Sequence, residues 1–306
     1  MTADTVTVGS FACELGDLEC KPADLPDFEQ WWQAESNGAD FTTMGCGTFR
    51  KMSGPVSGYV VATVQRTLAE RGLPARQVDR VVFATTDANL AQVDRDFVAG
   101  VLEAAGLVSC VPVLMSFQQC CASVTALGHG CALFDDPAVR NVLVVAFDAA
   151  ATDRERVRQF ALFGDAAASC LISRDGGGEL RLASSAVQID YEGLLGRDSM
   201  VSRQQVARDT LDAVLGTTGT SIAEVTMVFP TNLYQPLTSF NAMVAGIHKS
   251  KLHFAEMLYR VGHCGNCDWM LNLIDYRDKV GLRRGEQYLS HASAPGFFAG
   301  GLLVGV

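Results

Sequence analysis

Two kinds of apolar spacing alternate along the chain. Short continuous apolar runs are typical of buried strands, and apolar residues three or four positions apart are typical of helices. The runs predict strands at 78–86, 111–117, 141–147, 163–173, 179–187, 222–229, 288–294 and 298–306. The helical spacing predicts helices at 56–71, 94–105, 121–134, 204–215, 237–247 and 268–280. Glycine follows several of these helices, as is common at helix ends.

This alternation favours an α/β architecture with buried, largely parallel sheets. Polar residues predict a turn at 87–89, and glycines after an aspartate predict another at 175–178. The stretch 188–203 mixes glycines with charged residues, so we expect a surface loop there. No low-complexity linker divides the chain.

The composition narrows the class of protein. The chain has 306 residues, of which 48% are hydrophobic and 19% charged, and this excludes a disordered or fibrous protein. No apolar run approaches the roughly 20 residues that span a bilayer. The first residues lack the basic and apolar parts of a secretory signal. We therefore expect a soluble cytoplasmic protein whose ten cysteines are reduced.

The net charge of −10 argues against nucleic acid as a partner, because an acidic surface repels phosphate backbones. An acidic carrier protein would need a local basic patch on this chain. Arg154, Arg156 and Arg158, or Lys249 and Lys251, are the candidates for such a patch. Charge runs of this kind are more often a solvated face.

Two adjacent cysteines, Cys120 and Cys121, lie where a predicted strand meets a helix of small residues. A thiolate at a helix N-terminus is stabilised by the helix dipole and by free backbone N–H groups. Either cysteine is therefore a candidate nucleophile. A buried cysteine in such a place is more often part of a packed core.

His263 and Asp268 stand close together before the helix predicted at 268–280. A histidine beside a carboxylate can act as a base, because the carboxylate stabilises the protonated ring. The same segment contains Cys264 and Cys267 in a C-x-x-C pattern, which also fits a zinc site or a redox dithiol.

Zinc at the C-x-x-C pattern would need a second pair of ligands, for which His248 and His253 are the candidates by spacing. Five positions apart on a helix, their side chains would point about 140° away from each other. This argues against a shared metal, and we expect none.

Three further segments stand out for their polar or small residues. Thr231 and Asn232 follow a predicted strand, and Asn232 is placed to reach a cleft. Asp165 follows a glycine and is expected to bond neighbouring backbone N–H groups. Gly296 lies in a glycine-rich ending that allows close backbone approach. No phosphate-binding glycine motif is present, so nucleotide binding has no positive signal in the sequence.

Taken in order, these segments resemble the ketoacyl-acyl-carrier-protein synthase III family of the thiolase fold. Six residues after Cys120 comes Ala126-Leu127, as after the family's nucleophile. Residues 163–167, Phe-Gly-Asp-Ala-Ala, look like the family's Gly-Asp-Gly/Ala-Ala segment. The ending, 281–301, is similar to the family's glycine-rich closing strands. The likeness covers residues 80–306 well and the first 80 weakly.

The departures from the family pattern indicate a branch. Condensing members carry a Pro-His-x-x-Asn segment and a later Gly-Asn, whose histidine and asparagine assist decarboxylation of a malonyl thioester. Here Thr231 stands where that histidine is expected. His263 with Asp268 is instead similar to the acyltransferases of natural-product pathways, which have a Cys-His-Asp triad. Asn266 can still be aligned with the condensing-type asparagine, so a decarboxylative condensing enzyme remains the alternative.

The resemblance implies a five-layered αβαβα fold of two similar halves, 1–175 with the cysteine and 176–306 with the histidine and aspartate. It implies that Cys120 is the nucleophile, with Cys121 as the rival, that His263 is the base, and that Asp268 orients the ring. We expect substrate to contact a set of neighbouring residues: Thr231, Asn232, Cys121, Asn266 and Gly296.

The resemblance also implies the partners. No bound cofactor is expected, and the donor is an acyl-phosphopantetheine thioester on a carrier protein or coenzyme A. The acceptor is a small molecule with a hydroxyl or amine, and the chain forms a homodimer. A catalytically silent subunit that supports a homologue's site is the non-enzyme alternative.

Overall fold

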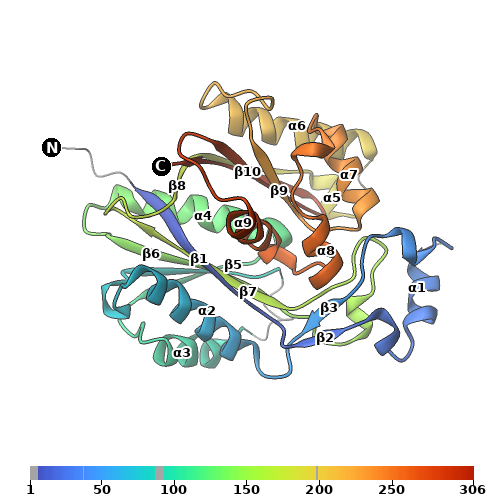
Figure 1. Cartoon of the computed structure of the whole chain (residues 1–306), viewed down its shortest axis with the longest axis horizontal. Coiled ribbons are helices and arrows are strands. Elements are labelled where there is room, and N and C mark those ends of the chain that lie inside the picture. The colour runs from blue at the N-terminus through green and yellow to red at the C-terminus, as the bar shows by residue number, and fades with distance from the viewer. Residues whose placement is uncertain (1–5, 37, 87–92, 198) are drawn as a thin grey trace.

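The structure is a computed structural model that describes residues 6–36, 38–86, 93–197 and 199–306. The predicted turn at 87–89 lies outside the described residues. Strands and helices alternate over most of the described chain (Figure 1). The strands are β1 (Thr7–Leu15), β2 (Leu18–Cys20), β3 (Phe49–Lys51), β4 (Arg80–Ala84), β5 (Val111–Met115), β6 (Asn141–Asp148), β7 (Ala166–Ser173), β8 (Leu180–Ile189), β9 (Met227–Pro230), β10 (Gln287–Ala294) and β11 (Phe297–Gly305).

The helices match the predicted spacing closely where the apolar pattern is regular. They are α1 (Phe28–Ser36), α2 (Val56–Arg71), α3 (Arg95–Ala104), α4 (Ala122–Ala132), α5 (Tyr191–Leu194), α6 (Met200–Gly216), α7 (Gln235–Val244), α8 (Ala255–Val261) and α9 (Asp268–Lys279). Two short 3-10 helices matter for the site, namely η4 (Gln119–Cys121) and η8 (Gly265–Cys267).

The large sheet runs in the order β5-β4-β6-β7-β1-β8-β11-β10-β9. Among the strands of the described residues, only β4 with β5, β4 with β6, and β9 with β10 pair in parallel, so the prediction of largely parallel sheets is wrong. The reason is the connections: β10 and β11 are joined by a tight turn, and β6 reaches β7 without a crossover helix. At the centre, β1 and β8 pair at one position, Val8 with Leu180.

The layers follow from which helix packs on which face. Helices α2 and α3 cover one outer face of the sheet, α6 and α7 cover the other, and α4 and α9 lie between the two parts of the sheet (Figure 1). This confirms the predicted five-layered arrangement. The predicted boundary between two halves falls in the turn that joins β7 to β8.

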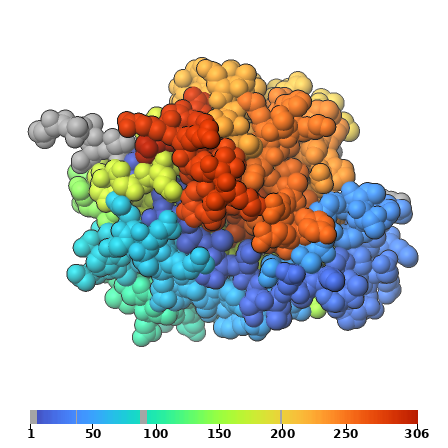
Figure 2. Space-filling view, in the orientation of Figure 1, coloured from blue at the N-terminus to red at the C-terminus, as the bar shows by residue number. Residues whose placement is uncertain are grey.

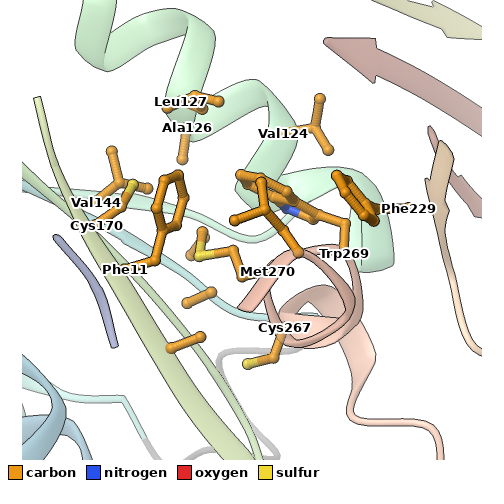
Figure 3. Close-up of a cluster of buried hydrophobic side chains, with 14 of the residues drawn as sticks. Phe11, Val124, Ala126, Leu127, Val144, Cys170, Phe229, Cys267, Trp269 and Met270 are labelled. Carbon is orange, nitrogen blue, oxygen red and sulfur yellow. The ribbon is translucent and has the colours of Figure 1, made fainter. Parts of the chain in front are cut away.

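The middle layer is the main hydrophobic core. Figure 3 shows Val124 of α4 and Trp269 of α9 pointing toward one another, with Phe11 of β1 beside them. The rings of Phe11 and Trp269 meet edge to face, with centroids 6.3 Å apart. Trp269 Nε1 also donates to Ser123 Oγ at 2.8 Å. The two central helices are therefore held together by both packing and a buried hydrogen bond.

The segment before residue 56, where the family likeness is weak and no element was predicted, forms β1 and a small lobe. In the lobe, Trp32 and Phe41 pack edge to face on Tyr234 from the other half of the chain. Backbone N–H groups of Gly47 and Thr48 donate to the carbonyl of Tyr259. In Figure 2 this blue lobe accordingly lies against orange residues at one end of the molecule.

The stretch 188–203 is not the predicted surface loop. Strand β8 continues to Ile189 because it pairs with β11 there, and α5 and the start of α6 fill much of the rest. Ser199 caps α6, since its Oγ accepts from the backbone N–H of Ser202 at 3.0 Å.

Arg156 belongs neither to a basic patch nor to the solvated face that the sequence favoured, because its side chain is buried. Its guanidinium bonds both carboxylate oxygens of Asp165, at 2.6 and 2.9 Å. Arg154 pairs with Glu35 at 2.8 Å. Asp165 further accepts from the backbone N–H groups of Met52 and Ala150, so its role is structural as expected, although these donors are not its neighbours in the chain. Within the described residues, no helix is long and apolar enough to cross a membrane.

Candidate active site

The two cysteines lie in the connection from β5 to α4, and the backbone there is tightly wound. The N–H of Gln119 bonds the carbonyl of Ser116, and the N–H of Cys121 bonds the carbonyl of Gln118. Gln119 has φ 51°, a left-handed conformation that is uncommon for a residue with a side chain. Cys120 lies within this bend, two residues before α4 begins, and its side chain is partly exposed.

The environments of the two thiols differ sharply. Cys121 is fully buried in the central core, and burial raises the pKa of its thiol far above the usual value. Cys120 is partly exposed, and its Sγ lies 3.5 Å from Nε2 of His263. Of the two thiols, that of Cys120 is the one that is both partly exposed and next to a basic side chain.

His263 is held by its backbone on the strand-like segment 162–164. Its N–H donates to the carbonyl of Leu162, and its own carbonyl accepts from the N–H of Gly164. Gly262, with φ 76°, ends α8 and turns the chain into this position. The ring of Phe163 packs edge to face on the imidazole, with centroids 4.6 Å apart, and leaves His263 fully buried.

Asp268 is the first residue of α9, and its buried carboxylate is fully bonded. Oδ2 accepts from His263 Nδ1 at 2.5 Å and from the backbone N–H of Asn232 at 2.7 Å. Oδ1 accepts from the backbone N–H of Cys264 at 2.8 Å. The hydrogen bond to Nδ1 puts a ring proton on the Asp268 side, so in the neutral ring Nε2 faces Cys120 as an acceptor.

The electrostatics follow from burial and from this contact. Burial by itself lowers the pKa of His263, but the Asp268 carboxylate outweighs it and holds the pKa well above the usual value. Burial raises the pKa of Cys120, and the nearby His263 partly opposes that rise. The pair therefore keeps a proton to higher pH than an isolated histidine would, ready for transfer within the site.

The structure gives several of the expected substrate-binding residues other partners. Thr231 is buried, and its Oγ1 accepts from the backbone N–H of Ser293 at 3.0 Å. Asn232 supports Asp268 through its backbone, while its Nδ2 is buried without a partner among the described residues. Gly296 sits in the β10–β11 turn, where a Cβ would meet Leu194.

The side-chain amide of Asn266 bonds a carboxylate rather than the thiol of Cys120. Its Nδ2 donates to the carboxylate of Asp148 at 2.6 Å, and its backbone N–H donates to the same oxygen at 2.7 Å. The group beside Cys120 is His263 instead. The amide of Asn266 is thus committed to a structural contact.

The C-x-x-C cysteines are part of the core. Cys264 and Cys267 are fully buried, and their thiols donate to different carbonyls, those of Val261 and Ala166. His253 bonds Asp275 at 2.8 Å rather than either thiol. Over the part of the chain that the structure describes, no group of three histidine, cysteine or carboxylate side chains is placed to hold a metal ion.

Sequence reasoning missed Asp148, the last residue of β6, which is buried beside the site. It also lines a cavity of about 270 Å³, together with Thr86, Glu155, Arg158 and Phe163. The only signal was that Asp148 interrupts the most apolar run of the chain. Phe163, whose ring packs on the His263 imidazole, also lines this cavity.

Comparison with known proteins identifies the fold. The sequence model of the family 3-oxoacyl-[acyl-carrier-protein] synthase III matches residues 117–190. No curated protein matches the chain.

Similar solved structures span the chain. ChlB3, described as an acyltransferase, is 15% identical with a TM-score of 0.85, and the alignment covers 99% of this chain and 98% of ChlB3. The 3-oxoacyl-(acyl carrier protein) synthase III of Xanthomonas oryzae is 13% identical with a TM-score of 0.84 and 98% coverage of both chains. A single-residue variant of Xanthomonas campestris OleA is 12% identical, with a TM-score of 0.82 and coverage of 99% and 100%. The chain thus has the thiolase fold of ketoacyl synthase III structures.

Proposed function

We propose that the protein is an acyltransferase that moves an acyl group from a thioester through a Cys120 acyl-enzyme to a hydroxyl or amine of a small molecule. One observation carries this proposal: a partly exposed thiol, a buried imidazole and a buried carboxylate form one continuous chain of contacts, at 3.5 and 2.5 Å. In a thiolase fold, that chain supplies a nucleophile, a base and a group that fixes the base.

The first half-reaction forms the acyl-enzyme. Cys120 Sγ attacks the thioester carbonyl as its proton passes to Nε2 of His263. The tetrahedral intermediate collapses, its C–S bond to the donor breaks, and His263 returns the proton to the leaving thiol. Asp268 keeps Nδ1 protonated and stabilises the imidazolium between these two transfers.

The second half-reaction uses the same base. Nε2 of His263 takes the proton of the acceptor hydroxyl or amine, whose oxygen or nitrogen attacks the acyl carbon. The bond to Sγ breaks, and the proton returns to Cys120. A positioned base of this kind contributes roughly 10²–10⁴-fold to rate.

Decarboxylative condensation is the second candidate, and the site supports it less well. Enolate formation needs donors aimed at the developing charge. Thr231 stands where the resemblance puts a histidine donor, and its shorter, buried side chain accepts at Oγ1 from the backbone N–H of Ser293. The amide of Asn266 is bonded to Asp148. A base next to the thiol suits acyl transfer to an acceptor that must lose a proton.

The donor and assembly extend the same proposal. The donor is an acyl-phosphopantetheine thioester, on a carrier protein or coenzyme A, and no resident cofactor takes part. The protein acts in the cytoplasm, in natural-product biosynthesis, as a homodimer. Support for the dimer comes from β5, an edge strand just before the nucleophile, where Val111 and Leu114 are exposed, as is Phe117 directly after the strand.

Intact-mass spectrometry after incubation with a panel of acyl thioesters tests the function. We expect one acyl adduct on the wild-type chain and on Cys121→Ala, and none on Cys120→Ala. An adduct that survives Cys120→Ala would contradict the assignment of the nucleophile. No adduct with any thioester would favour the silent-subunit alternative. Release of carbon dioxide from a malonyl thioester would favour condensation.

A further inference from the structure

Asp148 is a buried carboxylate beside the site that the proposed reaction does not use. It ends β6, and both of its oxygens are engaged by different parts of the chain. Oδ1 accepts from Thr85 Oγ1 at 3.0 Å, from the backbone N–H of Thr86 at 2.7 Å and from Thr86 Oγ1 at 2.8 Å. Oδ2 accepts from the backbone N–H and the side-chain amide of Asn266.

The backbone of η8 is shaped to receive this carboxylate. Gly265 has φ 60°, and a Cβ on it would lie 2.0 Å from Oδ2 of Asp148. Any side chain at 265 would thus collide with the oxygen that holds Asn266. This close approach puts η8 in direct contact with the end of β6.

Asn266 also contacts α4, the helix that follows the proposed nucleophile. Its carbonyl accepts from Ser123 Oγ at 2.5 Å, and Ser123 lies in the first turn of α4, three residues after Cys120. Ser123 Oγ in turn accepts from Trp269 Nε1 on α9. One asparagine therefore touches the helix that follows Cys120 and the end of β6, and it lies in the element that follows His263.

We propose that Asp148 is a positioning residue of the acyl-transfer site: by clamping Asn266 and η8 to the ends of β4 and β6, it sets the distance between the Cys120 thiol and the His263 imidazole. This inference rests on the proposed function for its consequence in catalysis. The clamp is specific because five donors of the described residues converge on one side chain, and these five are neutral hydroxyl and amide groups.

A purely electrostatic role of Asp148 would change the reactivity of Cys120 in the opposite direction, which makes the proposal testable. Burial raises the pKa of Cys120, and the charge of Asp148 adds to that rise. If charge were all that mattered, Asp148→Asn would make Cys120 more reactive. If Asp148 holds the geometry, the same change makes Cys120 less reactive, because the thiol loses its contact with His263.

The test is the rate of Cys120 alkylation by iodoacetamide, followed on the Cys120 peptide by mass spectrometry, together with single-turnover acylation. We expect Asp148→Asn to slow alkylation and to slow acylation roughly 10–100-fold, because a misplacement near 1 Å can cost about 100-fold in rate. The rate of acyl-enzyme formation at saturating thioester should fall, with little change in KM. Faster or unchanged alkylation would overturn the proposal.

Two further variants separate an effect on the position of the Cys120 and His263 side chains from a general loss of stability. Asp79→Asn is the matched control, since its carboxylate bonds the backbone N–H groups of Arg140 and Asn141 at the opposite end of β6. It should leave both rates unchanged. Asp148→Asn combined with Asn266→Asp exchanges the two partners. The amide at 148 then offers its oxygen to the Thr85 and Thr86 donors and its N–H to the new carboxylate.

The exchange variant should recover part of the lost rate, because the backbone N–H of residue 266 still lacks the acceptor that Oδ2 of Asp148 gives it; a variant no faster than Asp148→Asn counts against the clamp. Thermal unfolding of each variant shows whether it folds. If Asp148→Asn does not fold, Thr86→Val removes one donor and should give a smaller slowing in the same direction; no slowing by it would refute the proposal. The expected alkylation changes with no acylation of the wild type would indicate that the proposed function fails while the clamp stands.

Discussion

Exchange of Asp268 for asparagine tests both the charge and the hydrogen bonds of the carboxylate in the candidate triad, because the side chain keeps its shape. The carboxylate accepts three hydrogen bonds, from His263 Nδ1 and Asn232 N on Oδ2 and from Cys264 N on Oδ1. An amide has one oxygen, so its N–H₂ must face a donor in either orientation. At least one buried donor is left without a partner.

Each orientation damages the reaction in a definite way. With the amide oxygen toward His263, the imidazolium loses the charge that stabilises it. With the amide nitrogen toward His263, Nδ1 must accept, and the ring proton moves to Nε2, which then cannot take a proton from Cys120. We therefore expect transfer to slow roughly 10²–10⁴-fold. One unsatisfied buried donor should also lower the free energy of unfolding by about 1–3 kcal/mol.

Rapid-quench mass spectrometry of acyl-enzyme formation and decay measures the effect, and urea unfolding measures the stability. Asp275→Asn is the control: Asp275 bonds His253 at 2.8 Å from the same helix, α9, outside the contacts of Cys120. It removes a histidine–aspartate bond without touching the site. Transfer by Asp268→Asn at the wild-type rate, or an equal loss in Asp275→Asn, would refute the reasoning.

Three further outcomes are expected. Because the pKa of His263 is raised well above 6.5, the free base appears only at higher pH, so the transfer rate should rise with pH and its acid limb should lie above 6.5 in a pH–rate profile. Arg156→Met leaves the buried Asp165 carboxylate without its cation and should lower the free energy of unfolding by about 3–5 kcal/mol in urea titration; a loss below about 1 kcal/mol would show that water reaches the site. Gly265→Ala should lower the melting temperature and the acylation rate together, because the new Cβ would lie 2.0 Å from a carboxylate oxygen at a left-handed φ; unchanged values would mean that η8 moves freely.

Sequence reasoning predicted best what depends on neighbours in the chain. Helix α2 begins and ends where the apolar spacing and Gly72 indicate, with Gly72 at φ 66°. The segments that carry Cys120 and His263 were singled out from local patterns and the family resemblance. The structure brings these two side chains together across 143 residues, and their catalytic roles stay a prediction.

What escaped prediction depends on partners far away in the chain. Strand β1 is buried because it pairs with β7, which no local pattern of residues 7–15 announces. Asp148 looks like a break in an apolar run, and its meaning comes from donors 62 and 118 residues away. The end of β8 was mistaken for a loop because its exposed Ile189 gains order only by pairing with β11.

The imidazole and its carboxylate both come from one short stretch, 262–268, whereas the thiol comes from the other half of the chain. The proposed reaction therefore needs both halves of the chain at once. Because His263 would serve both half-reactions, a substitution within that stretch would affect the loading of Cys120 as well as the transfer that follows.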